Sequence, residues 1–298
     1  PPSTLITCPV IYSASDKKTA REEISLGCPI LPNGTFANLV FCCSSLRSSS
    51  SGHSMAPGEI ALTLISGANS FAKDLVIFDT DNTLYPYDPA HSAAQKAVRD
   101  KVVSTFSISP EHFDGVFKEA RNQVKARLKD TAASHSRLLY MQRMLEIMEL
   151  GSQVLLALDF EQTYWRTFLS NAILFKDVKE LLDDIRLLGI PIAIVTDLTA
   201  QIQFRKVVYF ELDNYFDYIV TSEEAGFDKP HEAPFKIALE KMQPKGNCIW
   251  MIGDNPISDI LGARQKINAV TLQKVQTISA RNIEGIEPDA SFSKFSDL

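Results

Sequence analysis

The chain has 298 residues, of which 45% are hydrophobic and 22% are charged, and its formal net charge at pH 7 is −6. This size and composition are typical of a globular protein with one large or two modest domains. The acidic balance argues against a nucleic-acid binder, which normally carries a basic face, and no apolar run reaches the roughly 18 residues of a membrane span.

Residues 1–55 differ from the rest of the chain, because turn residues and serines are frequent in them and no helical or strand period persists. This composition predicts a disordered leader. The serine content also fits an organelle import segment, but the acidic residues Asp16, Glu22 and Glu23 argue against import.

The cysteines bear on the cellular compartment. Four of the five, Cys8, Cys28, Cys42 and Cys43, lie in this first segment, and Cys248 is alone in the remainder. A lone cysteine cannot form a disulfide within the rest of the chain, which favours a reducing compartment. We therefore expect a cytoplasmic protein, with organelle import through residues 1–55 as the alternative.

The first regular element is predicted at Leu75–Phe78, a short apolar run that is followed by Asp79. Residues 89–172 then have a helical pattern almost throughout. The helices are expected at 90–106, 110–128, 135–149 and 153–170. Pro110 fits the first turn of the second of these helices. An all-helical stretch directly after the first strand predicts a separate cap domain.

The second half of the chain alternates between helices and strands. Helices are expected at 177–188, 231–242 and 256–265, and strands at Ile190–Val195, Tyr218–Thr221 and Cys248–Ile252. Continuous apolar runs of this length are typical of parallel strands that are buried on both faces. Right-handed crossovers between such strands place their carboxyl ends at one edge of the sheet, where ligands bind in open α/β folds.

We therefore predict an α/β fold with a Rossmann-like, three-layer core around a parallel sheet, and with an all-helical cap domain inserted after the first strand. The expected boundaries are 56–88 for the first part of the core, 89–172 for the cap and 173–298 for the second part of the core.

Polar residues gather at the predicted edge of the sheet. They are Asp79, Asp81, Thr196, Lys229, Asp254 and Asp259. Four carboxylates packed together without a cation would repel one another. Ligands that are all oxygen call for a hard cation, and Mg²⁺ is the common one where the substrate is a phosphate. The metal and Lys229 together would let a phosphate dianion approach, so we predict a Mg²⁺ cofactor and a small phosphorylated metabolite as the partner.

Each of these residues can be given a role in phosphoryl transfer. Asp79 is the expected nucleophile, since a carboxylate can form an acyl phosphate. Asp81 is the expected general acid toward the leaving alcohol and then the general base for water, which predicts a raised pKa when substrate is bound. The Thr196 hydroxyl and the backbone N–H of Asp197 are expected to bind phosphoryl oxygens, and Lys229 is expected to neutralise charge.

The last motif predicts the metal site. Asp254 is expected to ligate the metal directly. Asp259, about one helical turn further on, is expected to contact the groups that bind the metal rather than the metal itself. In the cap, His135 and Arg137 precede an apolar helical face and are expected to reach down to the substrate. The alternative for His135 is a surface position at the start of a helix.

The ordered set of these segments resembles the haloacid dehalogenase superfamily, of the kind that carries a helical cap after its first motif. The segment Asp79–Leu84 (DTDNTL) matches the first motif, Thr196 the second, Lys229 with Pro230 the third, and Gly253-Asp254 with Asp259 the fourth. The resemblance covers roughly residues 72–298. It implies that the metal is bound by the carboxylate of Asp79, the backbone carbonyl of Asp81 and the carboxylate of Asp254.

Two segments are similar to one branch of the superfamily, which contains pyrimidine 5′-nucleotidases and N-acylneuraminate-9-phosphatases. They are Tyr215–Pro230 and Ser258–Ala263. One residue departs from the family pattern, because Asp197 stands where many relatives have asparagine.

These observations predict a phosphatase that hydrolyses a small phosphate monoester, either a sugar phosphate or a nucleoside monophosphate, through an aspartyl-phosphate on Asp79. Three alternatives stay open. A dehalogenase would need neither a metal nor a second acid, so Asp81 and Asp254 argue against it. A phosphomutase would return the phosphoryl group, and the sequence does not exclude it. A non-hydrolytic phosphoacceptor domain would be compact, so the insert at 89–172 argues against it.

Overall fold

The computed structural model of the protein describes residues 75–244, 248–275 and 285–298. The predicted leader at 1–55 and residues 56–74 of the predicted core lie outside these ranges. Within them, no helix has the length and apolarity needed to cross a bilayer.

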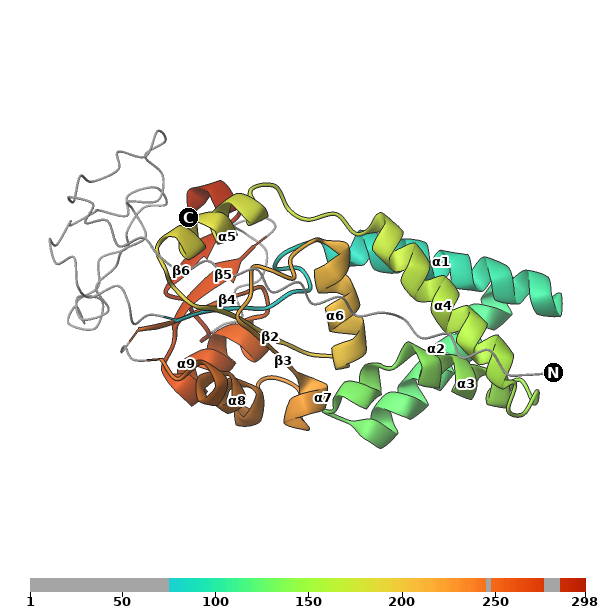
Figure 1. Cartoon of the computed structure of the whole chain (residues 1–298). Helices are drawn as coiled ribbons and strands as arrows, with labels where there is room; N and C mark the ends of the chain where they lie inside the picture. The colour runs from blue at the N-terminus through green and yellow to red at the C-terminus, as the bar shows by residue number, and fades with distance from the viewer. Residues whose placement is uncertain (1–74, 245–247, 276–284) are drawn as a thin grey trace, which may run out of the picture. The chain divides into compact units, whose positions relative to one another are not determined.

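A six-stranded parallel sheet lies at the centre of the core, in the order β3-β2-β1-β4-β5-β6 (Figure 1). The strands are β1 (Leu75–Phe78), β2 (Ile192–Thr196), β3 (Tyr218–Thr221), β4 (Ile249–Gly253), β5 (Val270–Lys274) and β6 (Ala290–Phe292). Phe78 at the end of β1 is level with Ile194 of β2 and with Ile252 of β4. The carboxyl ends of these three strands therefore deliver the residues that follow them to one edge of the sheet.

Helices cover both faces of the sheet, which gives the core its three layers (Figure 1). Leu75 and Ile77 of β1 share a buried cluster with side chains of α8 (Glu232–Met242) and α9 (Gly262–Ile267). Val76 and Phe78 point to the opposite face, because successive side chains of a strand alternate, and share a cluster with α5 (Val178–Leu187). The apolar runs of the sequence are thus buried on both sides, and the predicted α/β fold class is confirmed.

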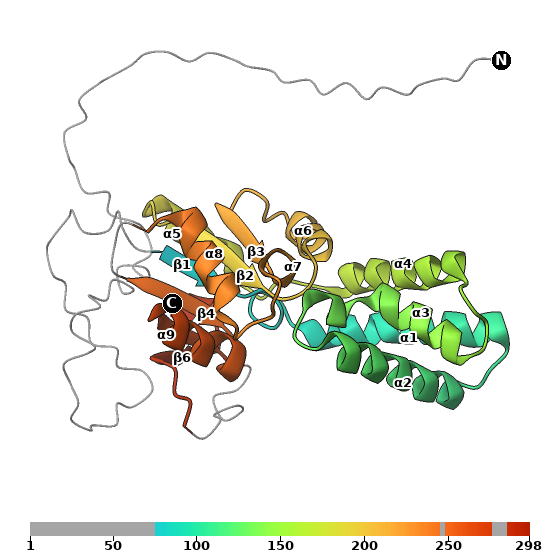
Figure 2. The ribbon, with the colours of Figure 1, turned by 90° about the horizontal axis from the view of Figure 1, so that it is seen from below.

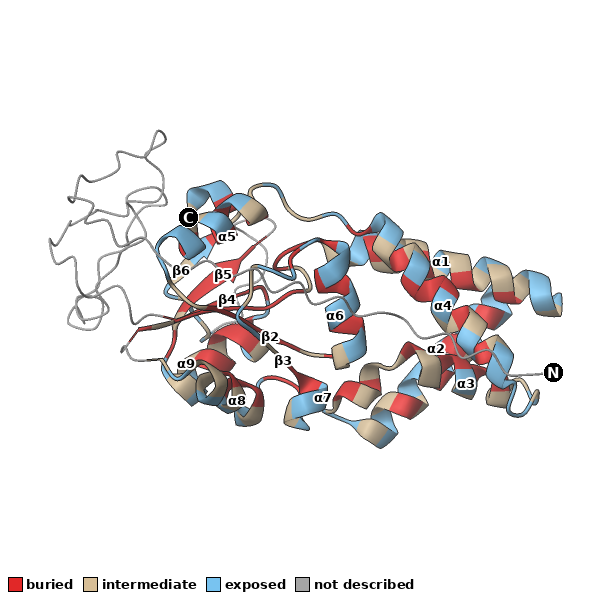
Figure 3. Ribbon diagram, viewed as in Figure 1, coloured by how far each residue is buried: buried red, intermediate tan, exposed pale blue. Residues whose placement is uncertain are grey.

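Four long helices follow β1 and pack against one another as a helical cap (Figure 2). They are α1 (Tyr87–Phe106), α2 (Pro110–Leu128), α3 (Arg137–Ile147) and α4 (Val154–Asn171), with a 3₁₀ turn, η3 (Ala132–His135), before α3. Their inward faces are lined by buried side chains, whereas their outer faces are exposed (Figure 3). Pro110 stands in the first turn of α2, and the Ser109 side chain accepts a hydrogen bond from the N–H of His112, so this helix begins where the sequence predicted.

The structure differs from the sequence prediction at several elements. The helix predicted at 135–149 is shorter in the structure, where it spans Arg137–Ile147, because the Ser136 side chain accepts a hydrogen bond from the N–H of Leu139 and starts α3 at Arg137. The helix predicted at 256–265 begins as a π-helix, η4 (Pro256–Leu261), and continues as α9. Six elements of the described residues were not predicted: η3, α6 (Ala200–Tyr209), α7 (Ser222–Ala225), β5, β6 and η5 (Phe295–Asp297).

Candidate active site

A pocket of about 380 Å³ opens at the carboxyl edge of the sheet. All nine residues that the sequence singled out line it: Asp79, Asp81, His135, Arg137, Thr196, Asp197, Lys229, Asp254 and Asp259. Core and cap both contribute, since His135 and Arg137 belong to the cap. The pocket thus brings together acidic, cationic and hydroxyl groups from segments that are far apart in the sequence.

Lys229 is the buried centre of this site. Its Nζ lies 2.7 Å from Oδ1 of Asp79 and 2.6 Å from Oδ1 of Asp259, and only 1% of its side chain is exposed. Burial alone would lower the pKa of Lys229, but the carboxylates of Asp259, Asp79 and Asp197 raise the pKa well above its ordinary value. The ammonium group is therefore permanently charged and bridges two acidic side chains.

Three carboxylates meet beside this ammonium. One oxygen from each of Asp79, Asp254 and Asp259 lies within 4.8 Å of the other two. Burial raises the pKa of Asp79 well above its ordinary value, and the neighbouring Asp259 and Asp254 raise it further, although Lys229 opposes them. A second cation would relieve this repulsion, and buried carboxylate oxygens are the donors that a hard divalent cation prefers. The donor set therefore fits a site for a divalent metal ion.

Gly253, at the end of β4, allows Asp259 to approach the strand. A Cβ atom at position 253 would lie 2.5 Å from Cβ, Cγ and Oδ2 of Asp259, a separation that real Cβ contacts do not reach. Asp259 is also fixed by the N–H of Asn255, which donates to its Oδ2 at 2.9 Å. A glycine before Asp254 is thus a steric requirement of the carboxylate cluster.

This steric requirement can be tested with Gly253→Ala. We expect a loss of roughly 1–3 kcal/mol in the free energy of unfolding, as is usual when extra atoms are forced into a packed interior, because Asp259 must move. Urea unfolding monitored by circular dichroism measures it. The matched control is Gly115→Ala on α2, where nothing lies within 4 Å of the added Cβ and alanine should stabilise the helix. Equal unfolding free energies in the two variants would contradict the argument.

Thr196 and Asp197 are held by hydrogen bonds with other elements of the core. The Thr196 hydroxyl lies 2.8 Å from that of Thr80, and Nε2 of Gln203 donates to it at 3.0 Å. The Asp197 carboxylate accepts from Oγ of Ser222 at 2.8 Å and from the backbone N–H of Lys229 at 2.9 Å. Asp197 thus ties the end of β2 to the loop that carries Lys229.

Asp81 has a strong partner that the sequence did not reveal. Nζ of Lys206, on α6, donates to both carboxylate oxygens at 2.7 and 3.0 Å, and the hydroxyl of Tyr85 donates to Oδ1. Burial would raise the pKa of Asp81, but Lys206 and the hydrogen bonds from Tyr85 and Thr80 hold the pKa below its ordinary value. The pKa of Asp81 is thus lowered in the protein without substrate, whereas the raised pKa predicted from the sequence concerns the substrate-bound state.

The sequence does carry one signal for Lys206. The residues of α6 that face the core are Ile202, Gln203, Lys206 and Val207, which lie on one helical face. Two polar residues on the buried face of a helix must find partners, since burial of an unpaired polar group is costly. The partners of Gln203 and Lys206 are Thr196 and Asp81.

The two cap residues lie at the junction of cap and core. Nε2 of His135 lies 3.0 Å from Oδ2 of Asp228, the residue before Lys229, so His135 is not an isolated surface residue. Arg137 is buried, donates to the carbonyl of His135 and to the hydroxyl of Tyr87, and stacks over aromatic rings of the cap. Its remaining donors can serve a ligand in the pocket.

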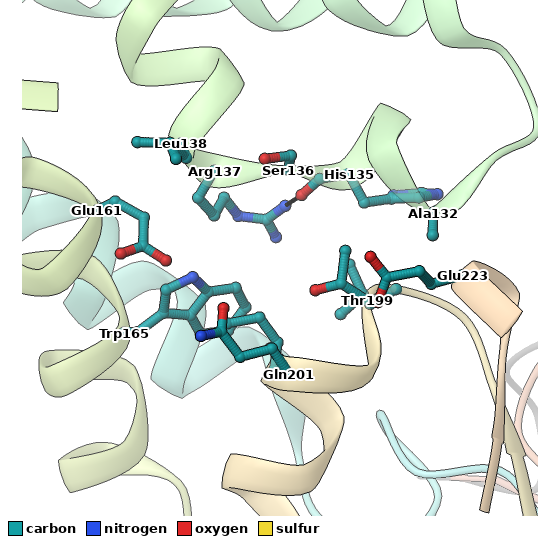
Figure 4. Close-up of a pocket in the computed structure, with 12 residues that line it drawn as sticks. Ala132, His135, Ser136, Arg137, Leu138, Glu161, Trp165, Thr199, Gln201 and Glu223 are labelled. Atoms are coloured by element: carbon teal, nitrogen blue, oxygen red, sulfur yellow. Dashed lines mark hydrogen bonds between the residues drawn. The ribbon is translucent and has the colours of Figure 1, made fainter. Parts of the chain in front are cut away.

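A second, smaller pocket of about 160 Å³ adjoins the first, because His135, Arg137 and Leu198 line both. Figure 4 shows Arg137 and Glu161 on the cap side of this pocket, and Thr199 and Gln201 on the core side. Its lining is mostly polar and includes the carboxylates of Glu161 and Glu223. This pocket has room and hydrogen-bonding groups for the part of a ligand that extends away from Asp79.

The chain matches the family model of haloacid dehalogenase-like hydrolases over residues 73–265. It is 36% identical over 201 residues to the ribulose-1,5-bisphosphate 5-phosphatase of Halopiger xanaduensis, which covers 67% of this chain and 82% of that protein. It is 24% identical over 229 residues to the glyceraldehyde 3-phosphate phosphatase of Methanocaldococcus jannaschii, which covers 74% of this chain and 90% of that protein.

Solved structures have the same fold. The crystal structure of YfnB from Bacillus subtilis, which is bound to magnesium, superposes with a TM-score of 0.55 at 19% identity and covers 75% of this chain and 95% of that one. At this level of identity the similarity concerns the fold alone.

Proposed function

The chain belongs to the haloacid dehalogenase-like hydrolase family, and from this premise we propose that it is a divalent-metal-dependent phosphatase acting on a small phosphorylated metabolite. The observation that carries the proposal is the Asp79 carboxylate, held by Lys229 within a buried group of three carboxylates that line an open pocket. A carboxylate in such surroundings can attack phosphorus, since neighbouring cations offset the repulsion between the two anions.

In the first step, Oδ2 or Oδ1 of Asp79 attacks the phosphorus atom, and the bond between phosphorus and the ester oxygen breaks. Asp81 gives its proton to that oxygen, so the alcohol leaves neutral and an acyl phosphate stays on Asp79. In the second step, Asp81 takes a proton from water, and the hydroxide attacks phosphorus. The bond between phosphorus and the Asp79 oxygen breaks, so that inorganic phosphate leaves, the Asp79 carboxylate is regenerated and Asp81 is protonated again. Lys229 offsets the charge on Asp79 throughout, and the Thr196 hydroxyl and the backbone N–H of Asp197 donate to phosphoryl oxygens.

The carboxylates of Asp79 and Asp254, together with the backbone carbonyl of Asp81, would hold the metal ion, with Asp259 supporting them. A hard cation such as Mg²⁺ would, when bound, offset the charge of the acidic cluster and of the phosphoryl group. The Mg²⁺ in the YfnB structure supports this choice of ion. Asp259 serves mainly as the partner of Lys229 and of the Asn255 N–H in this assignment.

The substrate is proposed to be a phosphorylated sugar or a similar short polyol. The names of the two relatives, a ribulose-1,5-bisphosphate 5-phosphatase and a glyceraldehyde 3-phosphate phosphatase, support a sugar-type substrate. The second pocket supports it too, because amide, hydroxyl and carboxylate groups can bind the hydroxyls of a carbon chain. His135 and Arg137, which line both pockets, are proposed to contact the substrate. A nucleoside monophosphate, as the branch similarity implies, is the alternative within the same reaction class.

The other reactions considered for this fold receive less support. The presence of Asp81 beside the pocket argues against a dehalogenase, whose leaving halide needs no proton. The helical cap inserted after β1 argues against a phosphoacceptor domain that only holds the phosphoryl group. A phosphomutase differs from a phosphatase in excluding water, so its products distinguish it.

The experiment that tests the proposal is release of inorganic phosphate from p-nitrophenyl phosphate with Mg²⁺ and with EDTA. We expect repeated turnover with Mg²⁺, no turnover with EDTA, and recovery when Mg²⁺ is added in excess, because the acidic cluster cannot accept a phosphate dianion without the cation. A panel containing ribulose-1,5-bisphosphate, glyceraldehyde 3-phosphate and nucleoside monophosphates then ranks the substrates. Full activity in EDTA would reject the metal site, and a single burst without turnover would indicate a phosphoacceptor.

A further inference from the structure

Lys206 is a cation that the reaction scheme above does not use, although it lies against the expected general acid. It is almost fully buried, with 2% of its side chain exposed, and it contacts both oxygens of Asp81. The two residues are 125 positions apart in the sequence, so this contact is made only by the packing of α6 beside the end of β1. Desolvation of an ammonium group costs free energy, so the burial of a lysine beside a single carboxylate calls for a functional explanation.

The surroundings of Lys206 hold its ammonium group in place. Its Nζ lies 5.7 Å from the ring centre of Tyr85, 5.9 Å from that of Trp165 and 5.5 Å from that of Phe168, distances at which a cation is attracted to an aromatic face. Tyr85 follows the first motif, whereas Trp165 and Phe168 belong to α4 of the cap. The ammonium group is therefore enclosed by both the core and the cap.

This arrangement fixes the position of the Asp81 carboxylate. Oδ1 accepts hydrogen bonds from Tyr85, Lys206 and, at 3.2 Å, Thr80, whereas Oδ2 accepts one from Lys206 at 3.0 Å. Oδ1 thus already accepts three hydrogen bonds, whereas Oδ2 accepts one and can form a further hydrogen bond. A carboxyl group that must hand a proton to a leaving oxygen works only when it is held at the right place, and a flexible one loses most of its effect.

We propose that Lys206 is a positioning residue, which fixes the Asp81 carboxylate so that Oδ2 carries the proton to the leaving oxygen of the substrate. The proposal rests on the proposed phosphatase function and adds a residue to it. In the step concerned, the proton of Oδ2 passes to the ester oxygen as the bond between that oxygen and phosphorus breaks. Lys206 itself exchanges no proton. Because its enclosure includes Trp165 and Phe168, the position of Asp81 also depends on the cap.

The proposal predicts an effect that depends on the leaving group. Phenyl phosphate releases phenol, whose pKa resembles that of a tyrosine side chain, about 10, whereas p-nitrophenol is far more acidic and leaves readily without a proton. The two esters differ only in the para nitro group. Since general acid catalysis contributes roughly 10²–10⁴-fold, we expect Lys206→Met to lose about 10–100-fold more kcat/KM on phenyl phosphate than on p-nitrophenyl phosphate, because kcat/KM reports the first step, in which the alcohol leaves. Asp81→Asn should show the same selectivity, and more strongly.

Steady-state kinetics of both esters, with Mg²⁺, measure this selectivity. Lys101→Met is the matched control, because Lys101 forms a cap ion pair with Asp159 and lines neither pocket, so both rates should stay as in the wild type. Circular dichroism verifies the fold of each variant. If Lys206→Met does not fold, Lys206→Arg keeps the charge but misplaces the donors, and the same selective loss is expected.

The outcomes separate the two proposals. An equal loss of kcat/KM on both esters, or no loss, in a folded Lys206 variant overturns the positioning role while leaving the phosphatase in place. Failure of the wild type to hydrolyse either ester rejects the phosphatase, and with it the role of Lys206. A selective loss in the variant, with the wild type active on both esters, supports both proposals.

Discussion

Asp79→Asn is expected to lower turnover at least about 10⁴-fold, since removal of a nucleophile leaves only binding and electrostatic effects to promote the reaction. An amide oxygen can still accept the hydrogen bond from Nζ of Lys229, which lies 2.7 Å from Oδ1 in the wild type. The loss should therefore appear in kcat with the fold intact. Phosphate release from p-nitrophenyl phosphate measures the rate, and mass spectrometry of acid-quenched protein detects the acyl phosphate at Asp79, which should be missing in the variant.

The same variant has a second expected effect, on stability. In the wild type, burial and the carboxylates of Asp259 and Asp254 raise the pKa of Asp79 above its ordinary value. A carboxyl group with a raised pKa in the folded state destabilises the protein once the pH rises above its ordinary pKa. In EDTA at neutral pH, the Tm of Asp79→Asn should therefore equal or exceed that of the wild type, and Mg²⁺ should raise the Tm of the wild type more.

An exposed carboxylate provides the control for this substitution. Asp213→Asn alters a side chain that bonds only to its neighbour Asn214 among the described contacts, and should change neither turnover nor Tm. Wild-type turnover in Asp79→Asn would exclude this residue as the nucleophile. A much lower Tm would instead mean that the carboxylate is needed for the fold, and the loss of activity would then carry no information about chemistry.

Lys229→Met is expected to have the second largest effect, and it should affect both rate and stability. The ammonium group offsets the charge of Asp79 during attack, so its removal should cost roughly 10³-fold in kcat, as for other groups that stabilise developing charge. It also leaves the buried carboxylates of Asp79 and Asp259 without their partner. Removal of one partner of a buried ion pair costs about 3–5 kcal/mol in the free energy of unfolding.

A double substitution separates the two causes. If unpaired carboxylates destabilise Lys229→Met, then Lys229→Met with Asp259→Asn should recover part of the lost stability in EDTA, without recovering turnover. Lys236→Met is the control, because Lys236 pairs on the surface of α8 with Glu232 and such pairs contribute at most about 1 kcal/mol. Urea unfolding measures all four proteins. A loss in Lys229→Met no larger than that of the control would contradict the buried ion-pair network.

The fold could be predicted where the sequence pattern repeats a strong local signal. The strands β1, β2 and β4 are short apolar runs followed by polar residues, and such runs occur where a strand is covered on both faces. The long cap helices have a clear helical period. By contrast, β5 contains Thr271, Gln273 and Lys274, all buried but polar, and β6 has three residues, so neither pattern indicates a strand by itself.

The position of the predicted site residues also follows from local pattern. Because parallel strands end at one edge, the residues after β1, β2 and β4 had to meet there, and all nine predicted residues line one pocket. Their chemical roles stay predictions until the variants above are measured. The membership of the nucleotidase branch is likewise a prediction, since the similar proteins named above are sugar-phosphate phosphatases.

The sequence by itself determined the fold class, the inserted helical cap and the acidic edge, because burial on two faces and strand direction are encoded by short-range periodicity. Only the tertiary structure decided which polar side chains pair: Lys206 with Asp81, Lys229 with both Asp79 and Asp259, and His135 with Asp228. Such pairs join residues that are 30 to 150 positions apart. Their contacts depend on how whole helices and loops pack, and no local pattern specifies that packing.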